Sequence, residues 1–195
     1  MPALLVGELE SACNYFYDKI KIKQSQCMTS VNERLREAAR AGYEIEIKVL
    51  LCNLECDASA KDEVGMTALM CAACNGHGAC VKILLTKKDV LIKDDNGMTA
   101  LMWAASGGHD ACIMILLPKS DASTTDYDGK TALMWAAWNG QQGSASLLLP
   151  ISNALAKDNS GQTASDLAHD GGHEVLAQLV ERLHAISTRA SRYRS

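Results

Sequence analysis

GMTALMWAASGGH, residues 97–109, is one of four closely similar stretches, each beginning 32 residues after the last. The other copies are GMTALMCAACNGH at 65–77, GKTALMWAAWNGQ at 129–141 and GQTASDLAHDGGH at 161–173. Every copy begins with a glycine, and an aspartate stands three residues before it. A threonine follows two residues after the glycine, and a second glycine stands near the end of each copy. Chance does not align so many columns at one period, so the chain contains an internal repeat.

The chemistry of one repeat predicts its structure. Asp62 and Gly65 favour a turn, because an aspartate bonds the backbone two residues on and glycine adopts backbone angles that other residues resist. Thr67 is typical of a helix start, and Gly76 of a helix end. A second apolar helix then runs to the ILL at 83–85. Neither helix can bury its apolar face alone, so the repeats are expected to stack into an all-α solenoid.

These residues resemble the ankyrin-repeat family, whose pattern is DxxGxTPLHxAAxxGHxxxVxxLL, over about residues 33–183. The motif TALMWAA is similar to the repeats of ankyrin-only proteins of some parasitic protists. Two columns depart from the pattern. Alanine replaces the proline at Ala68, Ala100 and Ala132, and methionine replaces the histidine at Met70, Met102 and Met134. These departures affect the histidine-centred hydrogen bonds that the resemblance implies, but not the fold.

The repeat sets the expected organisation of the chain. Residues 33–51, ERLREAARAGYEIEIKVLL, keep the AAxxG and LL positions and resemble an N-terminal capping repeat. In the last copy Glu181 replaces the final leucine of the second helix, which gives the polar outer face that a terminal repeat needs. The predicted segments are an N-terminal segment at 1–30, a degenerate capping repeat at 31–61, full repeats at 62–93, 94–125 and 126–157, a C-terminal capping repeat at 158–183 and a basic tail at 184–195.

The two ends lie outside the repeat. Leu5, Leu9, Cys13, Phe16 and Ile20 share one helical face, so the first 30 residues are consistent with a helix that packs on the N-terminal cap. A partner-binding or mobile segment is the alternative. The tail, HAISTRASRYRS, is interpreted as a solvated end, with a kinase site or an acidic docking contact as the alternative.

Composition limits the partner classes. The 195 residues carry a formal net charge of −4, which gives no reason to expect nucleic acid or an anionic membrane as partner. The first residues lack a secretory signal, and no apolar run is long enough to span a membrane. The eight cysteines are too few for a secreted disulfide scaffold. A monomeric cytoplasmic protein is therefore expected.

CAACNGHGAC, residues 71–80, contains the best candidate ligands for a metal. Cys71 aligns with tryptophans in two other copies, Cys80 aligns with small or apolar residues, and His77 belongs to the repeated turn. Gly76 would also break the helix between the cysteine pair and the other two side chains, whereas a zinc site needs convergent ligands. Structural cysteines are therefore the favoured interpretation, and a metal- or redox-responsive protein that uses Cys71, Cys74 and Cys80 is kept as an alternative.

The remaining function is recognition of another protein. No nucleophile motif, phosphate loop or metalloprotease motif is present, so no enzyme activity and no cofactor are expected. A non-catalytic scaffold or adaptor is predicted, with an inhibitor or targeting subunit of an enzyme as the alternative. The resemblance places partners on the concave side, along the turn tips and the first helices. The variable residues in those columns are Met66, Cys74, Asn75, Asn96, Met98, Ser106, Tyr127, Asp128, Lys130, Trp138, Asn139 and Gln162.

Trp138 is the strongest single candidate. It is compared with Cys74, Ser106 and His169, none of which demands a buried position, whereas Trp103 and Trp135 fall in the column expected to pack between repeats. Tryptophan is enriched in binding hot spots, so Trp138 is interpreted as an interface residue, with local packing as the alternative. The same repeat has a glycine- and serine-rich second helix, QQGSASLLL at 141–149, which predicts local softness.

Overall fold

The computed structural model describes residues 30–85 and 89–182, and within these ranges the protein is built from paired helices. The predicted N-terminal helix and the basic tail lie outside the described residues. The inner helices are α2 (Val31–Ala41), α4 (Ala68–Cys74), α6 (Ala100–Gly107), α8 (Ala132–Trp138) and α10 (Ala164–Asp170). The outer helices are α3 (Glu44–Leu51), α5 (Gly78–Leu84), α7 (Asp110–Leu116), α9 (Gln142–Leu148) and the helical residues 174–182.

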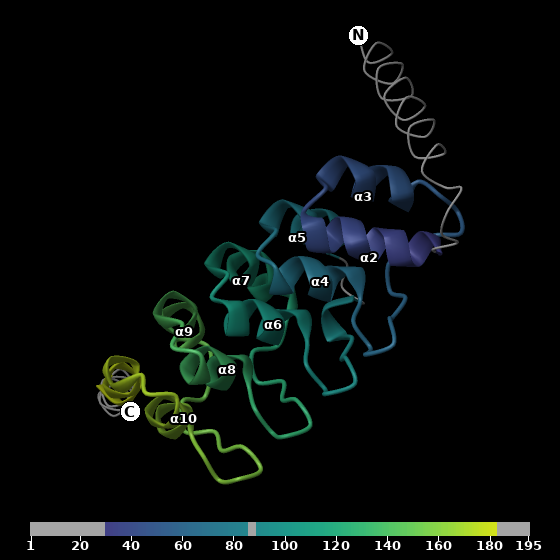
Figure 1. The fold of residues 1–195 in the computed structure, drawn as a ribbon. Coiled ribbons are helices and arrows are strands. Elements are labelled where there is room, and N and C mark those ends of the chain that lie inside the picture. The colour runs from purple at the N-terminus through teal and green to yellow at the C-terminus, as the bar shows by residue number, and fades with distance from the viewer. Residues whose placement is uncertain (1–29, 86–88, 183–195) are drawn as a thin grey trace, which may run out of the picture.

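The pairs stack in sequence order, as the all-α solenoid prediction requires. Figure 1 shows the inner helices in one row and the outer helices in a second row, with a turn projecting on the same side before each of α4, α6, α8 and α10. Each inner helix contacts the next inner helix, and α3, α5, α7 and α9 contact one another in turn. Short 3-10 helices, η1 (Asp89–Leu91) and η2 (Leu117–Lys119), lie in the connections. The fold is therefore an α-helical repeat solenoid.

Small residues hold the inner helices close together. Ala73, Ala105 and Ala137 occupy one column of the repeat, and all three are completely buried. The neighbouring leucine and methionine side chains, such as Leu101 and Met102, are buried in the same apolar cluster. Burying a side chain of this size contributes about 1.5–3 kcal/mol. The core is thus one continuous apolar layer shared by successive repeats.

A threonine begins each repeated inner helix, as predicted, and the cap is completed by methionine in three repeats and by Asp166 in the fourth. The Thr67 hydroxyl accepts a hydrogen bond from the backbone N–H of Met70 at 3.4 Å, and the Met70 sulfur accepts one from the backbone N–H of Thr67 at 3.5 Å. The same reciprocal pair recurs at Thr99 with Met102 and at Thr131 with Met134. The methionine sulfur therefore fills the position of the capping-box acceptor.

The turns before the inner helices, here called fingers, comprise residues 62–66, 94–98, 126–130 and 158–162. In each finger the aspartate carboxylate accepts backbone N–H groups two and four residues later, as Asp126 Oδ1 does from Asp128 and Lys130 at 3.0 and 2.8 Å. The predicted bond to the backbone two residues on is confirmed in all four fingers. Each finger is consequently a rigid platform rather than a loose loop.

Candidate functional site

The predicted site residues lie on the fingers and on the inner helices, and most of them reach the surface. Asn75, Asn96, Tyr127, Asp128, Trp138 and Asn139 are exposed, whereas Met66, Cys74, Ser106, Lys130 and Gln162 are half-buried. Together with these side chains, the fingers and the inner helices form the candidate surface. Its chemistry changes from repeat to repeat, while the core beneath it is nearly constant.

Met98 is the exception, and its prediction as a contact residue is corrected. Its side chain is only 4% exposed and belongs to the apolar core. Its backbone N–H donates to Asp94 Oδ1 at 2.9 Å, which fixes it at the base of the finger. The column contains Met66, Lys130 and Gln162 in the other repeats, and this variability suggested a surface position. Those three side chains are half-buried in the structure. A side chain so deeply buried offers a partner almost no contact area.

Trp138 lies at the C-terminal end of α8 and is 42% exposed. The Lys130 ammonium, from the finger of the same repeat, lies 5.8 Å from the centre of the Trp138 ring and 5.3 Å from that of Trp135. Both distances are within the range of cation–π attraction. Lys130 also approaches Asp128 at 3.9 Å. The third repeat therefore presents an exposed indole whose ring already has a cation beside it.

Trp103 and Trp135 have a different role from Trp138. Each half-buried indole donates its Nε1–H to the aspartate that begins the finger of its own repeat, Trp103 to Asp94 Oδ2 at 2.9 Å and Trp135 to Asp126 Oδ2 at 2.8 Å. The packing role predicted for this column is thus extended by a charge-assisted hydrogen bond that joins the inner helix to the finger. Trp103 and Trp135 therefore hold their fingers against the inner helices, whereas Trp138 is exposed to solvent.

The fingers are joined to one another by backbone hydrogen bonds. The N–H of Asp95 donates to the carbonyl of Val64, that of Tyr127 to Asn96 and that of Asn159 to Asp128. At Gly97, whose φ is +81°, a Cβ atom would lie 2.8 Å from the Tyr127 ring. Only glycine tolerates both the backbone angle and this close approach. Tyr127 is therefore an exposed ring, at 66%, on a fixed support.

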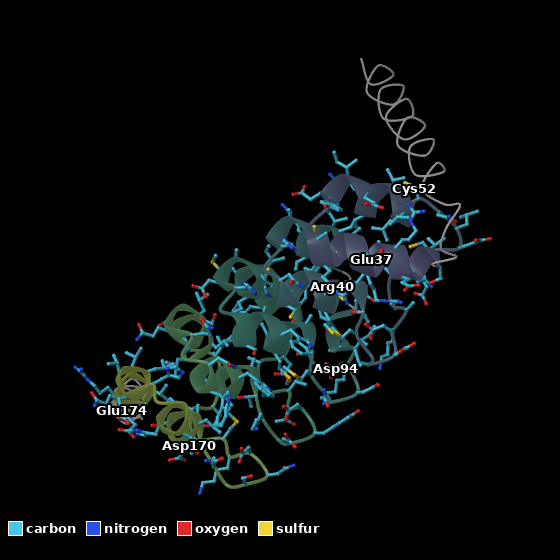
Figure 2. The ribbon with its side chains drawn as sticks, viewed as in Figure 1. Glu37, Arg40, Cys52, Asp94, Asp170 and Glu174 are labelled. Carbon is cyan, nitrogen blue, oxygen red and sulfur yellow. The ribbon has the colours of Figure 1, made fainter. Side chains whose placement is uncertain are left out.

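The structure adds a groove on α2 that the sequence reasoning missed. It has a volume of about 690 Å³ and is lined by α2 and the first finger, with Glu33, Arg36, Glu37, Arg40, Lys61, Asp62, Glu63 and Val64 around it. Figure 2 labels Glu37 and Arg40 on α2. An alignment of Gly42 with Gly76 would have placed Arg40 in the column of Cys74 and Trp138. The sequence of this first repeat departs from the repeat pattern, which concealed that equivalence.

The inner ridge is defined as the residues two positions before the positive-φ glycine after each inner helix: Arg40, Cys74, Ser106, Trp138 and Asp170. In the last repeat this glycine is Gly172, so the residue equivalent to Trp138 is Asp170 rather than His169. Successive inner helices contact one another, so these residues stand on neighbouring helices. Asn139 Nδ2, from the residue after Trp138, donates to Ser106 Oγ in the preceding repeat at 3.1 Å. One repeated position thus presents a cation, a thiol, a hydroxyl, an indole and a carboxylate.

The cysteines of the metal alternative do not form a site. Among the described residues, no group of three or more histidine, cysteine or acidic side chains is arranged to hold a metal ion. Cys71 and Cys80 are buried, and burial raises the pKa values of the Cys71, Cys74 and Cys80 thiols above the ordinary range. A raised pKa disfavours the thiolate, the form that binds metal and reacts. These observations favour packing cysteines.

The turn histidines connect neighbouring repeats. His77 Nε2 lies 3.0 Å from the carbonyl oxygen of Arg40, and His109 Nε2 lies 2.9 Å from that of Cys74. In the next repeat Gln141 makes the equivalent bond to Ser106 at 3.5 Å. The predicted turn role is therefore more specific, because each side chain bonds a carbonyl at the end of the preceding inner helix. Those carbonyls have no partner within their own helix.

Comparison with known proteins agrees with the geometry. None of the described helices is long and apolar enough to cross a membrane. No curated protein matches the chain. The family model described as ankyrin repeats (3 copies) matches residues 35–127 and residues 86–158, which together cover more than half of the 195 residues. With its stacked helix pairs and its fingers, the chain belongs to the ankyrin-repeat family.

Proposed function

We propose that this protein is a non-catalytic scaffold or adaptor that holds a partner protein on its fingers and inner helices. Ankyrin repeats generally mediate protein–protein interactions, and proteins built from them are typically non-catalytic. The supporting observation is Trp138, a large aromatic side chain that is 42% exposed, in the same repeat as the exposed Tyr127. Aromatic side chains of this kind bury much area with few rotatable bonds, which is why they dominate binding hot spots.

The contrast between the three tryptophans strengthens this proposal. Trp103 and Trp135 are held by hydrogen bonds to finger aspartates, so the fold uses them. Trp138 is 42% exposed and has the Lys130 ammonium 5.8 Å from its ring centre. An exposed tryptophan offers a partner a large surface to bury, and tryptophan is enriched in binding hot spots. Recognition is therefore the role that best accounts for Trp138.

An inhibitor or a targeting subunit of an enzyme would use the same surface. The difference lies in what the bound partner does, so an activity assay of the captured partner with and without this protein separates the two. We also propose a cytoplasmic location and a monomeric state. The six described cysteines are all free, which agrees with a reducing compartment. Cell fractionation and analytical ultracentrifugation test these two points.

The test of the binding proposal is capture of the native partner by the full chain and by Trp138→Ala. Loss of a hot-spot side chain costs about 2 kcal/mol of binding free energy, roughly a thirtyfold weaker complex. The matched control is Met114→Ala, because Met114 is 58% exposed but lies on the outer helix α7. Both variants should melt within a few degrees of the parent. Equal capture by Trp138→Ala and the parent, or unfolding of Trp138→Ala, would contradict the proposal.

A further inference from the structure

We infer that the partner segment bound at the third repeat presents a basic side chain, arginine or lysine, to the face of Trp138 between Asp128 and Asp170. This inference rests on the proposed function and names the chemistry of the segment that the surface fits. Three features of the described residues carry it: the cation already beside the ring, the excess of exposed carboxylates, and the places of Asp128 on the finger of the same repeat and of Asp170 on the neighbouring inner helix.

The first feature is that the indole pair already accepts a cation. Lys130 brings its ammonium to 5.3 Å from the Trp135 ring and 5.8 Å from the Trp138 ring. Trp135 is held in place by its bond to Asp126 Oδ2, so the pair is preformed. Lys130 is peculiar to this finger, because the other fingers have methionine or glutamine in its place. It therefore acts as an internal occupant of a site suited to an incoming cation.

An incoming basic group need not expel Lys130 from the surface. The ammonium keeps the closer ring of Trp135 and the nearby Asp128 carboxylate at 3.9 Å while it leaves the face of Trp138. Trp138 is the more exposed of the two indoles, so the outer face is the one that a partner reaches. Lys130 thus competes with the partner for Trp138, and its charge opposes the partner's charge.

The second feature is the charge balance of the surface. The exposed acids on the inner helices and fingers are Glu33, Glu37, Glu63, Asp95, Asp128, Asp166 and Asp170. On the same inner helices and fingers Arg40 is the exposed arginine or lysine, whereas Arg34, Arg36 and Lys130 are half-buried. Acids therefore outnumber bases, and an acidic segment would meet repulsion where a basic segment meets attraction.

The third feature is the position of two carboxylates relative to Trp138. Asp128 belongs to the finger of the same repeat, and 77% of its side chain is exposed. Asp170 occupies on α10 the inner-ridge position that Trp138 occupies on α8, and these two helices contact each other. Figure 2 labels Asp170 at the C-terminal end of the row. Packed helices lie about 8–10 Å apart, a distance that roughly three residues of an extended segment span.

The experiment uses two synthetic twelve-residue peptides that differ only at three positions, spaced three residues apart, which are arginine in one and glutamate in the other. Binding to the full chain is measured by fluorescence anisotropy over a range of salt concentrations. The arginine peptide should bind, and its affinity should fall with salt. Trp138→Ala should weaken it about tenfold, and Asp128→Asn and Asp170→Asn each about two- to fivefold.

The Lys130→Gln variant is the most informative, because the inference requires it to bind the arginine peptide more tightly than the parent does. Removal of the competing cation should strengthen binding of the arginine peptide about two- to fivefold. Glu44→Gln removes an exposed acid on the outer helix α3 and should leave binding unchanged. The inference is overturned if the glutamate peptide binds as tightly as the arginine peptide, if Lys130→Gln weakens the arginine peptide, or if the arginine peptide shows no binding at about millimolar concentration. None of these results affects capture of the native partner, which decides the proposed function separately.

Discussion

Replacement of Trp135 by phenylalanine should destabilise the protein although the side chain is only half-buried. The indole Nε1–H lies 2.8 Å from Asp126 Oδ2, and Asp126 is itself buried. A hydrogen bond to a charged group contributes about 1.5–3 kcal/mol, and phenylalanine leaves that carboxylate oxygen without this donor. The expected loss is about 2 kcal/mol, which for a chain of this size lowers the melting temperature by about 4–8 °C. Urea unfolding followed by circular dichroism measures the loss directly.

The other two tryptophans supply the comparison. Trp103→Phe should cost a similar amount, because Trp103 bonds Asp94 at 2.9 Å in the preceding repeat. Trp138→Phe should change the free energy of unfolding by less than about 0.5 kcal/mol, as surface substitutions usually do. If Trp135→Phe lowers the free energy of unfolding no more than Trp138→Phe does, the distinction between a tryptophan that bonds a finger aspartate and one that is exposed for a partner is wrong.

Four further predictions concern the contacts between repeats and the thiols. His109→Ala should cost about 1 kcal/mol in urea unfolding, whereas His109→Gln should retain most of it, because Gln141 makes the equivalent bond in the next repeat. Ser144→Ala should cost about 1.5–3 kcal/mol by the same measurement, since the Ser144 hydroxyl donates to Asp110 Oδ1 at 2.8 Å. Hydrogen exchange should be fastest, among the internal repeats, over residues 141–149, and uniform protection would remove that idea. Burial raises the pKa of Cys112 to about 11, so its protonated form favours folding fully below the thiol's ordinary pKa, and that contribution is lost as the pH rises through 11. Alkaline unfolding curves with and without Cys112→Ala measure it.

The repeat made the fold predictable because each unit restates the same local chemistry. Aspartate, glycine and threonine act through bonds within about five residues, so their roles could be assigned without tertiary information. The methionine of the cap was harder to interpret. Its sulfur accepts a hydrogen bond from the Thr67 N–H at 3.5 Å. Sulfur is a weak acceptor, so a methionine repeated at this position does not by itself predict the bond. The sequence showed that the usual histidine was missing, but not what replaced it.

The site was less predictable, because exposure and inter-repeat contacts depend on the stacked structure. Met98 shares a column with Lys130, yet it is buried while Lys130 reaches two indoles. The bond from Trp135 to Asp126 spans nine residues and joins a helix to a turn, so no helical periodicity reveals it. The α2 groove was missed because Arg40 belongs to a repeat whose sequence departs from the pattern of the others. Each miss concerns a contact between elements rather than the elements themselves.

The solenoid separates what folds the chain from what the chain recognises. The alanine column of the inner helices is completely buried and is shared by successive repeats, so a change there would disturb two interfaces at once. The inner ridge lies on the same helices but presents five chemically different side chains, from Arg40 to Asp170. Because each of these side chains meets few groups beyond its own and the adjacent repeat, one can change without displacing the core. Trp138 could therefore arise at a ridge position where neighbouring repeats have a cysteine or a serine, at little cost in stability and with a large gain in surface for a partner.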